Sequence, residues 1–193
     1  FGSLDNLNML AKHLASTANI IQIDLPDHGA SSHSDNISIQ NYVTAVQQTL
    51  QILGISAAHF VGHSLGGKIA MGLALNEPGL VTSLVVADIA PVAYSHTQQP
   101  YIDMMQSLDL TAIETRSQAR DALAAQVDDP ALAAFFTQSL DLREKRWLLG
   151  LDALSANMEH ILGFPEMGDA RFYGPALFLS GAESDYVQRA HRE

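Results

Sequence analysis

The sequence predicts an α/β fold, in which a mostly parallel sheet carries helices on both faces. Short apolar runs at 20–23, 59–61 and 83–87 alternate with segments of helical periodicity. Single helical segments separate these runs, which implies right-handed crossovers and parallel strands. Between residues 91 and 174 the alternation stops and helical signals follow one another. We therefore expect an α/β core with an inserted helical cap.

Capping residues mark the helices of the first half. Ser3 is a candidate N-cap, and the apolar residues that follow it at helical spacing are Leu4, Leu7, Leu10, Ala11 and Leu14. Ser38 opens a second helix, which Gly54 ends. The residues expected to face inward from it are Tyr42, Val43, Val46, Leu50 and Leu53. A third helix is predicted over 68–75, and the β-branched run 20–23 predicts a short buried strand.

The second half gives the signals of the insertion. Thr111 and Glu114 have the spacing of a capping box, and Asp128-Asp129-Pro130 indicates another helix start. A further helix is predicted over 140–154, and strand character returns at 176–179. These signals divide the chain into an incomplete core over 1–90 and 175–193 and a helical cap over 91–174.

Composition excludes several classes of function. Of the 193 residues 47% are hydrophobic and 16% charged, which is typical of a globular domain. The net charge of -11 argues against binding to nucleic acid, which needs a basic face. There is no cysteine, so disulfides and thiolate chemistry are excluded. We see no apolar run of about 20 residues, no signal peptide, and no metal or cofactor motif. We therefore expect a cytoplasmic protein with no membrane span and no cofactor.

The stretch V-G-H-S-L-G-G at 61–67 lies between a predicted strand and a predicted helix. In that context G-x-S-x-G predicts a nucleophile elbow, a turn so sharp that Ser64 is forced into strained backbone geometry. The turn exposes the Ser64 hydroxyl as a candidate nucleophile. It also points the Leu65 N–H at the same space, where a helix N-terminus favours an oxyanion. A Cβ atom at Gly62 or Gly66 is expected to collide with backbone. A glycine-rich loop without chemistry is the alternative.

Four further stretches accompany G-H-S-L-G-G at 62–67. They are F-G-S-L-D-N-L at 1–7, D-H-G-A-S at 27–31, D-I-A-P-V at 88–92 and S-G-A-E-S-D-Y-V at 180–187. Together they resemble the α/β-hydrolase superfamily, and more narrowly the small YbfF-like esterases. The resemblance implies a strand ending in His-Gly before residue 1, whose loop gives a second oxyanion donor. It also implies a loop with the catalytic histidine beyond residue 187, so this chain resembles an interior piece of an esterase.

The triad acid has two candidates, because the order Ser…Asp/Glu…His fits both Asp88 and Asp185. The commoner superfamily position, three residues beyond the glycine after the last strand, is Ser184 here. Asp88 ends a strand beside the nucleophile's strand and is favoured, although a capping carboxylate is its structural alternative. None of the eight histidines is expected to be the base. His63 is turned away by the elbow, and we expect it to line the substrate pocket together with Phe1.

The predicted activity is that of a serine carboxylesterase that forms an acyl-enzyme on Ser64. Its expected partner is a small ester of a short- to medium-chain acid, or a thioester. Residues 95–174 hold 12 acidic and 6 basic residues, which disfavours the phosphates of a coenzyme A thioester. Some residues of the cap are candidates for an acyl pocket or for plain helix packing: Tyr101, Met104, Met105, Phe135, Phe136 and Trp147.

Two other functions remain open. The same fold carries C–C hydrolases and synthases, and a non-catalytic ligand-binding member would also fit a chain without the histidine. Because a serine without a base is a poor nucleophile, residues 1–193 alone are expected to hydrolyse p-nitrophenyl esters negligibly. Unpaired strand edges are expected to make them prone to aggregate.

Overall fold

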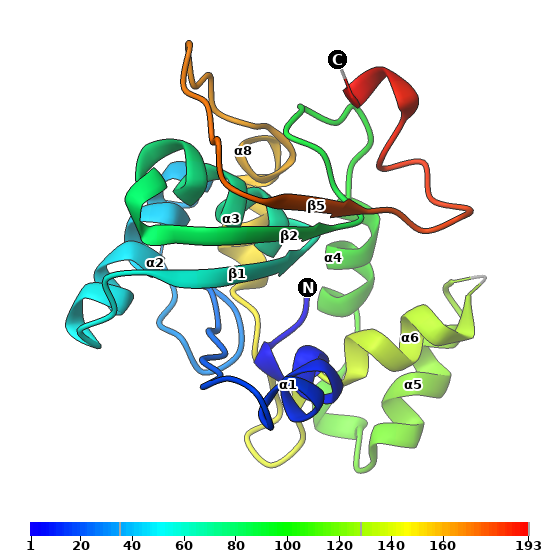
Figure 1. Ribbon diagram of the computed structural model, residues 1–193. Coiled ribbons are helices and arrows are strands. Elements are labelled where there is room, and N and C mark those ends of the chain that lie inside the picture. The colour runs from blue at the N-terminus through cyan, green and yellow to red at the C-terminus, as the bar shows by residue number, and fades with distance from the viewer. Residues whose placement is uncertain (35, 128, 193) are drawn as a thin grey trace. The chain divides into compact units, whose positions relative to one another are not determined.

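The computed structural model describes residues 1–34, 36–127 and 129–192 (Figure 1). The chain forms two compact units. Unit 1 consists of Phe1–Asp35 and Gln98–Met158, and unit 2 of Asn36–Thr97 and Glu159–Glu193. The division into a core over 1–90 and 175–193 and a cap over 91–174 stays a prediction.

Unit 2 contains the parallel sheet. Its strands are β1 (Ala58–His63), β2 (Val81–Ala87) and β5 (Ala176–Leu179), in the order β1-β2-β5 with β2 in the middle (Figure 1). All of them run parallel, and Ala87 pairs with His63 on one side and Leu179 on the other. The carboxyl ends of the strands therefore meet at one edge, where ligands bind in parallel sheets. The predicted strands at 59–61, 83–87 and 176–179 are confirmed.

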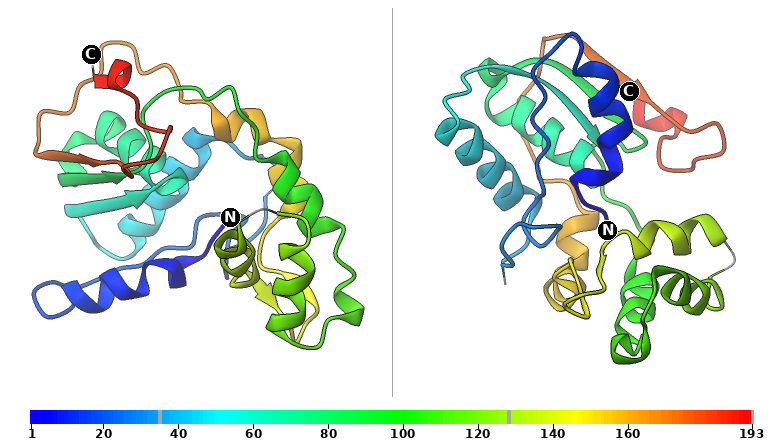
Figure 2. Two further views of the ribbon diagram at one scale, coloured as in Figure 1. Left: turned by 90° about the vertical axis from the view of Figure 1, so that its right-hand side faces the viewer. Right: turned by 90° about the horizontal axis from the view of Figure 1, so that it is seen from below.

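The helices of unit 2 are α2 (Ile39–Ile52) and α3 (Leu65–Asn76), with short 3-10 turns at Pro78–Leu80 and Arg189–Arg192. Helix α3 packs on β1 and β2, and α2 packs on α3 (Figure 2). The Ser38 hydroxyl caps α2 by accepting the Asn41 N–H at 3.1 Å, as predicted. Leu53 is predicted to face inward but is 53% exposed, because the helix ends one residue before it.

Unit 1 is built from short helices. They are a 3-10 turn at Leu4–Leu7, α1 (Asn8–Leu14), α4 (Gln99–Gln106), a 3-10 turn at Leu110–Ala112, α5 (Arg116–Ala124), α6 (Pro130–Thr137) and α7 (Leu151–Ala156). Helix α8 (Met158–Leu162) has its first residue in this unit and the rest in unit 2. Asp129 caps α6 by accepting the Ala131 N–H at 2.8 Å, whereas Asp128 lies outside the described residues. Among the described helices, none is long and apolar enough to cross a bilayer.

The predicted strand at 20–23 is wrong, because no described segment pairs with it. A strand is stabilised by the ladder it forms with a neighbour, and an apolar β-branched run alone does not supply one. Ile20 and Ile21 accordingly remain 38% and 46% exposed.

The predicted helix over 140–154 is wrong for residues 140–147 and right only for 151–154, which begin α7. Leu140–Asp141 (β3) and Arg146–Trp147 (β4) pair as an antiparallel hairpin, and Lys145 at its turn has φ +52°. A right-handed helix cannot continue through a residue in the left-handed conformation, so the turn at Lys145 prevents the helix that the apolar spacing predicts.

The predicted capping box at Thr111 forms four residues later. Thr115 and Gln118 make the reciprocal bonds that open α5. Thr111 instead donates its N–H to Asp109, the cap of the preceding 3-10 turn. The nearer carboxylate of Asp109 therefore binds the Thr111 N–H and excludes the predicted pairing.

Candidate active site

Ser64 lies at the turn between β1 and α3 with φ 51° and ψ -120°. The Ser64 N–H continues the ladder by donating to the Ala87 carbonyl at 3.0 Å. The Ser64 carbonyl then accepts the N–H groups of Gly67 and Lys68 in the first turn of α3. Positive φ is unfavourable for a residue with a Cβ, so the turn holds Ser64 under strain. This is the sharp strand-to-helix geometry that the sequence predicts.

Close packing explains two of the three glycines in this turn. A Cβ atom on Gly62 would lie 2.3 Å from the Gly66 carbonyl oxygen, and one on Gly67 would lie 2.6 Å from Ile89. A Cβ on Gly66, in contrast, would meet nothing within 4 Å. The expected collision is therefore right for Gly62 and wrong for Gly66. At Gly66 the backbone lies close to the strand, whereas the Cβ position of this residue points away from it.

Helix α3 begins at Leu65, directly after the serine. The first N–H groups of a helix have no partner inside it and carry its partial positive charge. The Leu65 N–H is therefore available to an anion beside Ser64. No residue that the structure describes makes a hydrogen bond with the Ser64 side chain.

Asp88 follows β2 as Ser64 follows β1, and it also has a positive φ, of 55°. Its N–H donates to the Leu179 carbonyl at 2.7 Å, and its carboxylate accepts the Gly181 N–H at 3.2 Å. Because β1 and β2 are adjacent, Ser64 and Asp88 start from neighbouring strand ends, about 4.8 Å apart. Asp185 is exposed in the turn after β5, where its carbonyl accepts a bond from Gln188.

Three histidines make hydrogen bonds away from Ser64. His59 lies 2.7 Å from the Ser83 hydroxyl across β1 and β2, and His28 bonds the Pro26 carbonyl. The His191 ring accepts the Gln188 N–H at 3.2 Å. No hydrogen bond in the described part of the chain joins an imidazole to Ser64. A base for Ser64 is therefore not identified among these contacts.

The two residues expected to line the substrate pocket lie in different units. Phe1 packs edge-on against Phe136 in unit 1, with ring centroids 6.2 Å apart. His63 is the exposed last residue of β1 in unit 2. The ring of Tyr101 also packs against that of Phe136, with centroids 5.3 Å apart. Phe136 itself is only 1% exposed. Phe136 is therefore a core residue of unit 1, whereas Phe1 and Tyr101 are half-buried, and a pocket of Phe1 with His63 stays a prediction.

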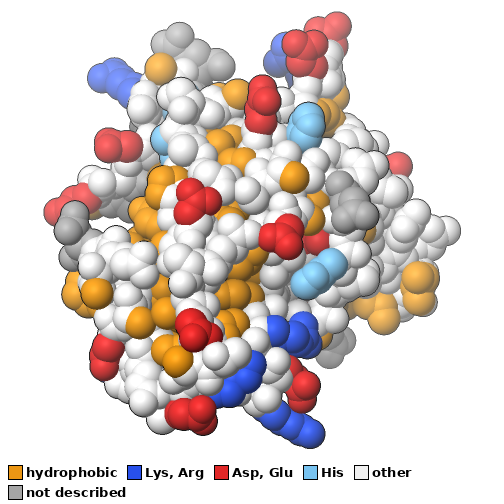
Figure 3. All heavy atoms as spheres, turned by 180° about the vertical axis from the view of Figure 1, so that it is seen from behind, with side chains coloured by type: hydrophobic (Ala, Val, Ile, Leu, Met, Phe, Trp, Pro, Cys, Tyr) orange, Lys and Arg blue, Asp and Glu red, His pale blue; other side chains and the backbone are white. Residues whose placement is uncertain are grey.

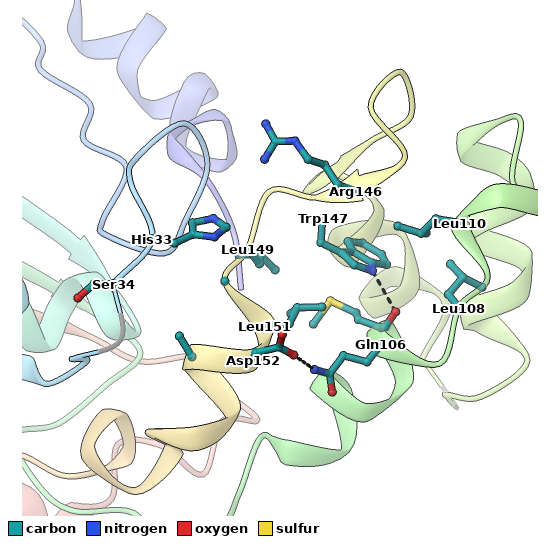
Figure 4. Close-up of a pocket in the computed structure, with 13 residues that line it drawn as sticks. His33, Ser34, Gln106, Leu108, Leu110, Arg146, Trp147, Leu149, Leu151 and Asp152 are labelled. Carbon is teal, nitrogen blue, oxygen red and sulfur yellow. Dashed lines mark hydrogen bonds between the residues drawn. The ribbon is translucent and has the colours of Figure 1, made fainter.

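Unit 1 has a separate, open pocket of about 690 Å³ (Figure 4). The Trp147 indole N–H donates to the Met105 carbonyl at 3.0 Å, and Gln106 bonds Asp152 at 2.6 Å. His33 lies opposite Trp147 in this view. Met105 and Trp147 are the two candidate acyl-pocket residues that line it, and neither Ser64 nor Asp88 does.

Sequence reasoning missed Lys68, which is 2% exposed in α3. Its ammonium donates to the carbonyls of Ile161, Leu162 and Gly163 at 3.3, 2.6 and 2.6 Å. Burial lowers the pKa of Lys68 to about 8. The signal was a lone lysine in the otherwise apolar segment 68–75, since a cation on such a helix is buried only when it is bonded.

No metal centre is indicated for the described residues, which contain no group of three or more His, Asp or Glu side chains placed to hold an ion. On the face shown in Figure 3, acidic side chains are scattered rather than gathered. A metal-assisted site would need such carboxylates and imidazoles to converge.

The comparisons with known proteins agree with the fold described above. A family model described as alpha/beta hydrolase fold matches residues 1–190. The chain is 32% identical over 197 residues to the Escherichia coli protein named esterase YbfF, covering 100% of this chain and 75% of that protein. It is 35% identical over 197 residues to the Danio rerio sn-1-specific diacylglycerol lipase ABHD11, covering 97% of this chain.

The solved structure named marine microorganism esterase has a TM-score of 0.92 and 29% identity, covering 98% of this chain and 76% of its own. This chain spans 62% of the length of the zebrafish relative. The family match, the parallel sheet and the strained serine after β1 lead to one conclusion. The chain belongs to the α/β hydrolase fold family.

Proposed function

We propose that the protein is a serine hydrolase that cleaves esters of short- to medium-chain carboxylic acids through an acyl-enzyme on Ser64. The observation that carries the proposal is the strained Ser64 at the strand-to-helix turn, with the Leu65 N–H beginning α3 beside it. The names of the relatives, esterase and diacylglycerol lipase, support an ester bond as the target.

In the proposed reaction the Ser64 oxygen attacks the ester carbonyl carbon, and the Leu65 N–H stabilises the oxyanion that forms. A histidine outside residues 1–193, as the family resemblance implies, takes the serine proton and passes it to the departing alcohol. Water, activated by the same histidine, then releases the acid from Ser64. Asp88 holds the histidine in the required tautomer and stabilises its imidazolium.

Asp88 is proposed as the acid rather than Asp185. It leaves β2 at the point where Ser64 leaves β1, and its backbone and carboxylate are both held by hydrogen bonds. Asp185 is exposed in a turn. An acid must hold its histidine in one place, so the fixed carboxylate suits the task better.

The substrate is proposed to be neutral rather than polyanionic. The chain carries a net charge of -11, which repels a thioester of coenzyme A relative to an uncharged ester. Thioesters remain accessible to the same nucleophile. A cytoplasmic location stays a prediction.

The test is labelling of the protein, expressed with the sequence that flanks these residues in its gene, by a fluorophosphonate probe. We expect labelling at Ser64, and loss of both labelling and ester turnover in Ser64→Ala. Ser83→Ala is the matched control, because Ser83 contacts His59 within the sheet and lies outside the strained turn, so this variant should keep full labelling. Asp88→Asn should lower turnover about 10³- to 10⁴-fold and Asp185→Asn less than about two-fold. An unlabelled parent protein would contradict the proposal and favour a ligand-binding member of the fold.

A further inference from the structure

Tyr94 joins the two segments that carry the candidate acids. Its hydroxyl accepts the Ala90 N–H at 2.8 Å and donates to the Tyr186 carbonyl at 2.7 Å. Ala90 is two residues after Asp88, and Tyr186 directly follows Asp185. A single phenol oxygen therefore connects the segment after β2 with the turn after β5.

The Tyr94 ring is itself held in place from the side of α3. The Lys68 ammonium lies 4.9 Å from the centroid of the ring, and the Tyr94 N–H donates to the Leu162 carbonyl at 3.1 Å. Lys68 bonds the same carbonyl, and its own N–H bonds the Ser64 carbonyl. The helix that follows the nucleophile and the segment that follows Asp88 are thus fixed against each other.

Other rings complete the surroundings of Tyr94. The ring centroids of His96 and Tyr186 lie 5.3 and 5.4 Å from that of Tyr94, and His191 lies 6.4 Å away. Burial raises the pKa of the Tyr94 hydroxyl above its usual value. The hydroxyl therefore keeps its proton and remains able to donate to Tyr186.

Asp88 depends on such external support. Its φ of 55° lies in the left-handed region, which an aspartate tolerates better than most residues but still at a cost that neighbouring contacts offset. On the upstream side the ladder bond to Leu179 holds it. On the downstream side the nearest fixed donor is the N–H of Ala90, a residue only 2% exposed, whose partner is the Tyr94 hydroxyl.

We propose that Tyr94 is a positioning residue of the hydrolase, whose hydroxyl fixes the Asp88 segment against the 181–187 turn and so sets where Asp88 meets the histidine base. This inference rests on the proposed function. Tyr94 touches neither the substrate nor the reacting atoms and acts through Asp88. Lys68 supports it by holding the ring.

The test compares Tyr94→Phe with Tyr173→Phe in the protein with its flanking sequence. Tyr94→Phe keeps the ring and its contact with Lys68 but removes both hydroxyl bonds. Tyr173, which is 90% exposed, is the control for the same chemical change. We expect kcat for a p-nitrophenyl ester to fall about 10- to 100-fold in Tyr94→Phe with KM little changed, because a displaced group loses transition-state stabilisation.

The pH profile separates positioning from a loss of folded protein. A less well placed Asp88 stabilises the imidazolium less, so the pKa of the histidine falls and the acidic limb of kcat/KM moves to lower pH. Lys68→Met is a second variant, and it should also move the acidic limb of the kcat/KM profile to lower pH. In an Asp88→Asn background, Tyr94→Phe should lower kcat little further, since the effects of residues that act through one group are not additive. Thermal unfolding establishes that each variant is folded.

A folded Tyr94→Phe with the kcat and acidic limb of the parent would overturn the inference. The inference would also be overturned if Tyr94→Phe lowered kcat by the same factor in the Asp88→Asn background as in the parent protein. In both cases Ser64 would still be labelled, so the proposed function would stand. Absence of labelling in the parent protein is the separate result that removes the proposed function itself.

Discussion

His28 is the buried imidazole of unit 1. It is 5% exposed, and its Nδ1 lies 2.9 Å from the Pro26 carbonyl. A carbonyl only accepts, so Nδ1 carries the proton. The His28 backbone also bridges to Leu149 of the segment after the hairpin. Burial lowers the pKa of His28 to about 4, because the protonated form loses its hydration.

This shift predicts a loss of stability in mild acid. Between about pH 6.5 and pH 4 the unfolded chain binds a proton at His28 and the folded chain does not. The free energy of unfolding therefore falls as the pH drops through this window, by about 3 kcal/mol in all. Urea unfolding at several pH values should show this slope in the parent protein and lack it in His28→Gln. His13→Gln, at an exposed helix position, should keep the slope. Equal slopes in the parent protein and His28→Gln would contradict the assignment.

The turn between β1 and α3 is the element on which the site depends. The turn is sharp because β1 ends at His63 and α3 begins at Leu65, so Ser64 alone connects the strand to the helix. Gly62 permits the close return of the backbone, and the ladder bond of Ser64 to Ala87 fixes the serine. The strain at Ser64 is held by these neighbours rather than by the serine itself.

Two glycine substitutions in this turn should behave oppositely. Gly62→Ala places a Cβ 2.3 Å from the Gly66 carbonyl oxygen, which is backbone and cannot rotate away. We expect a destabilisation of about 1–3 kcal/mol, measured by urea unfolding. Gly66→Ala meets nothing within 4 Å and replaces glycine by a better helix former, so stability should be unchanged or slightly higher. Equal losses for both variants would show that the turn is not packed as described.

Strand β5 leaves an apolar surface on the molecule as a whole. It pairs only with β2 among the described strands, and its residues Leu177, Phe178 and Leu179 are 52%, 47% and 48% exposed. An unpaired edge with apolar side chains is a template for association between chains.

We therefore predict that residues 1–193 expressed alone self-associate through β5. Phe178→Lys should raise the concentration at which association begins several-fold in sedimentation velocity, because a charge at the edge opposes pairing. Ile52→Lys is the control, since Ile52 is 84% exposed on α2 and the charge change is the same. If both substitutions act equally, net charge rather than the β5 edge governs association.

Local sequence was sufficient to predict a feature where the residues that determine it lie within one short segment. The Ser38 cap and Gly54 stop bounded α2, and the glycines around Ser64 predicted the strained turn that the serine occupies. Apolar strands separated by a single helix were sufficient to predict the parallel pairing of β1 and β2. In each case propensity, spacing and burial agree, so neighbours in sequence determine the outcome.

Tertiary structure alone decided the remaining features, because they depend on partners distant in sequence. The run 20–23 has strand propensity but no ladder partner among the described residues, and 140–147 has helical spacing but folds back as a hairpin. The bond from the Tyr94 hydroxyl to the Tyr186 carbonyl spans 92 positions. No local pattern encodes such a contact, since a hydrogen bond between separate loops exists only once the sheet has brought their ends together.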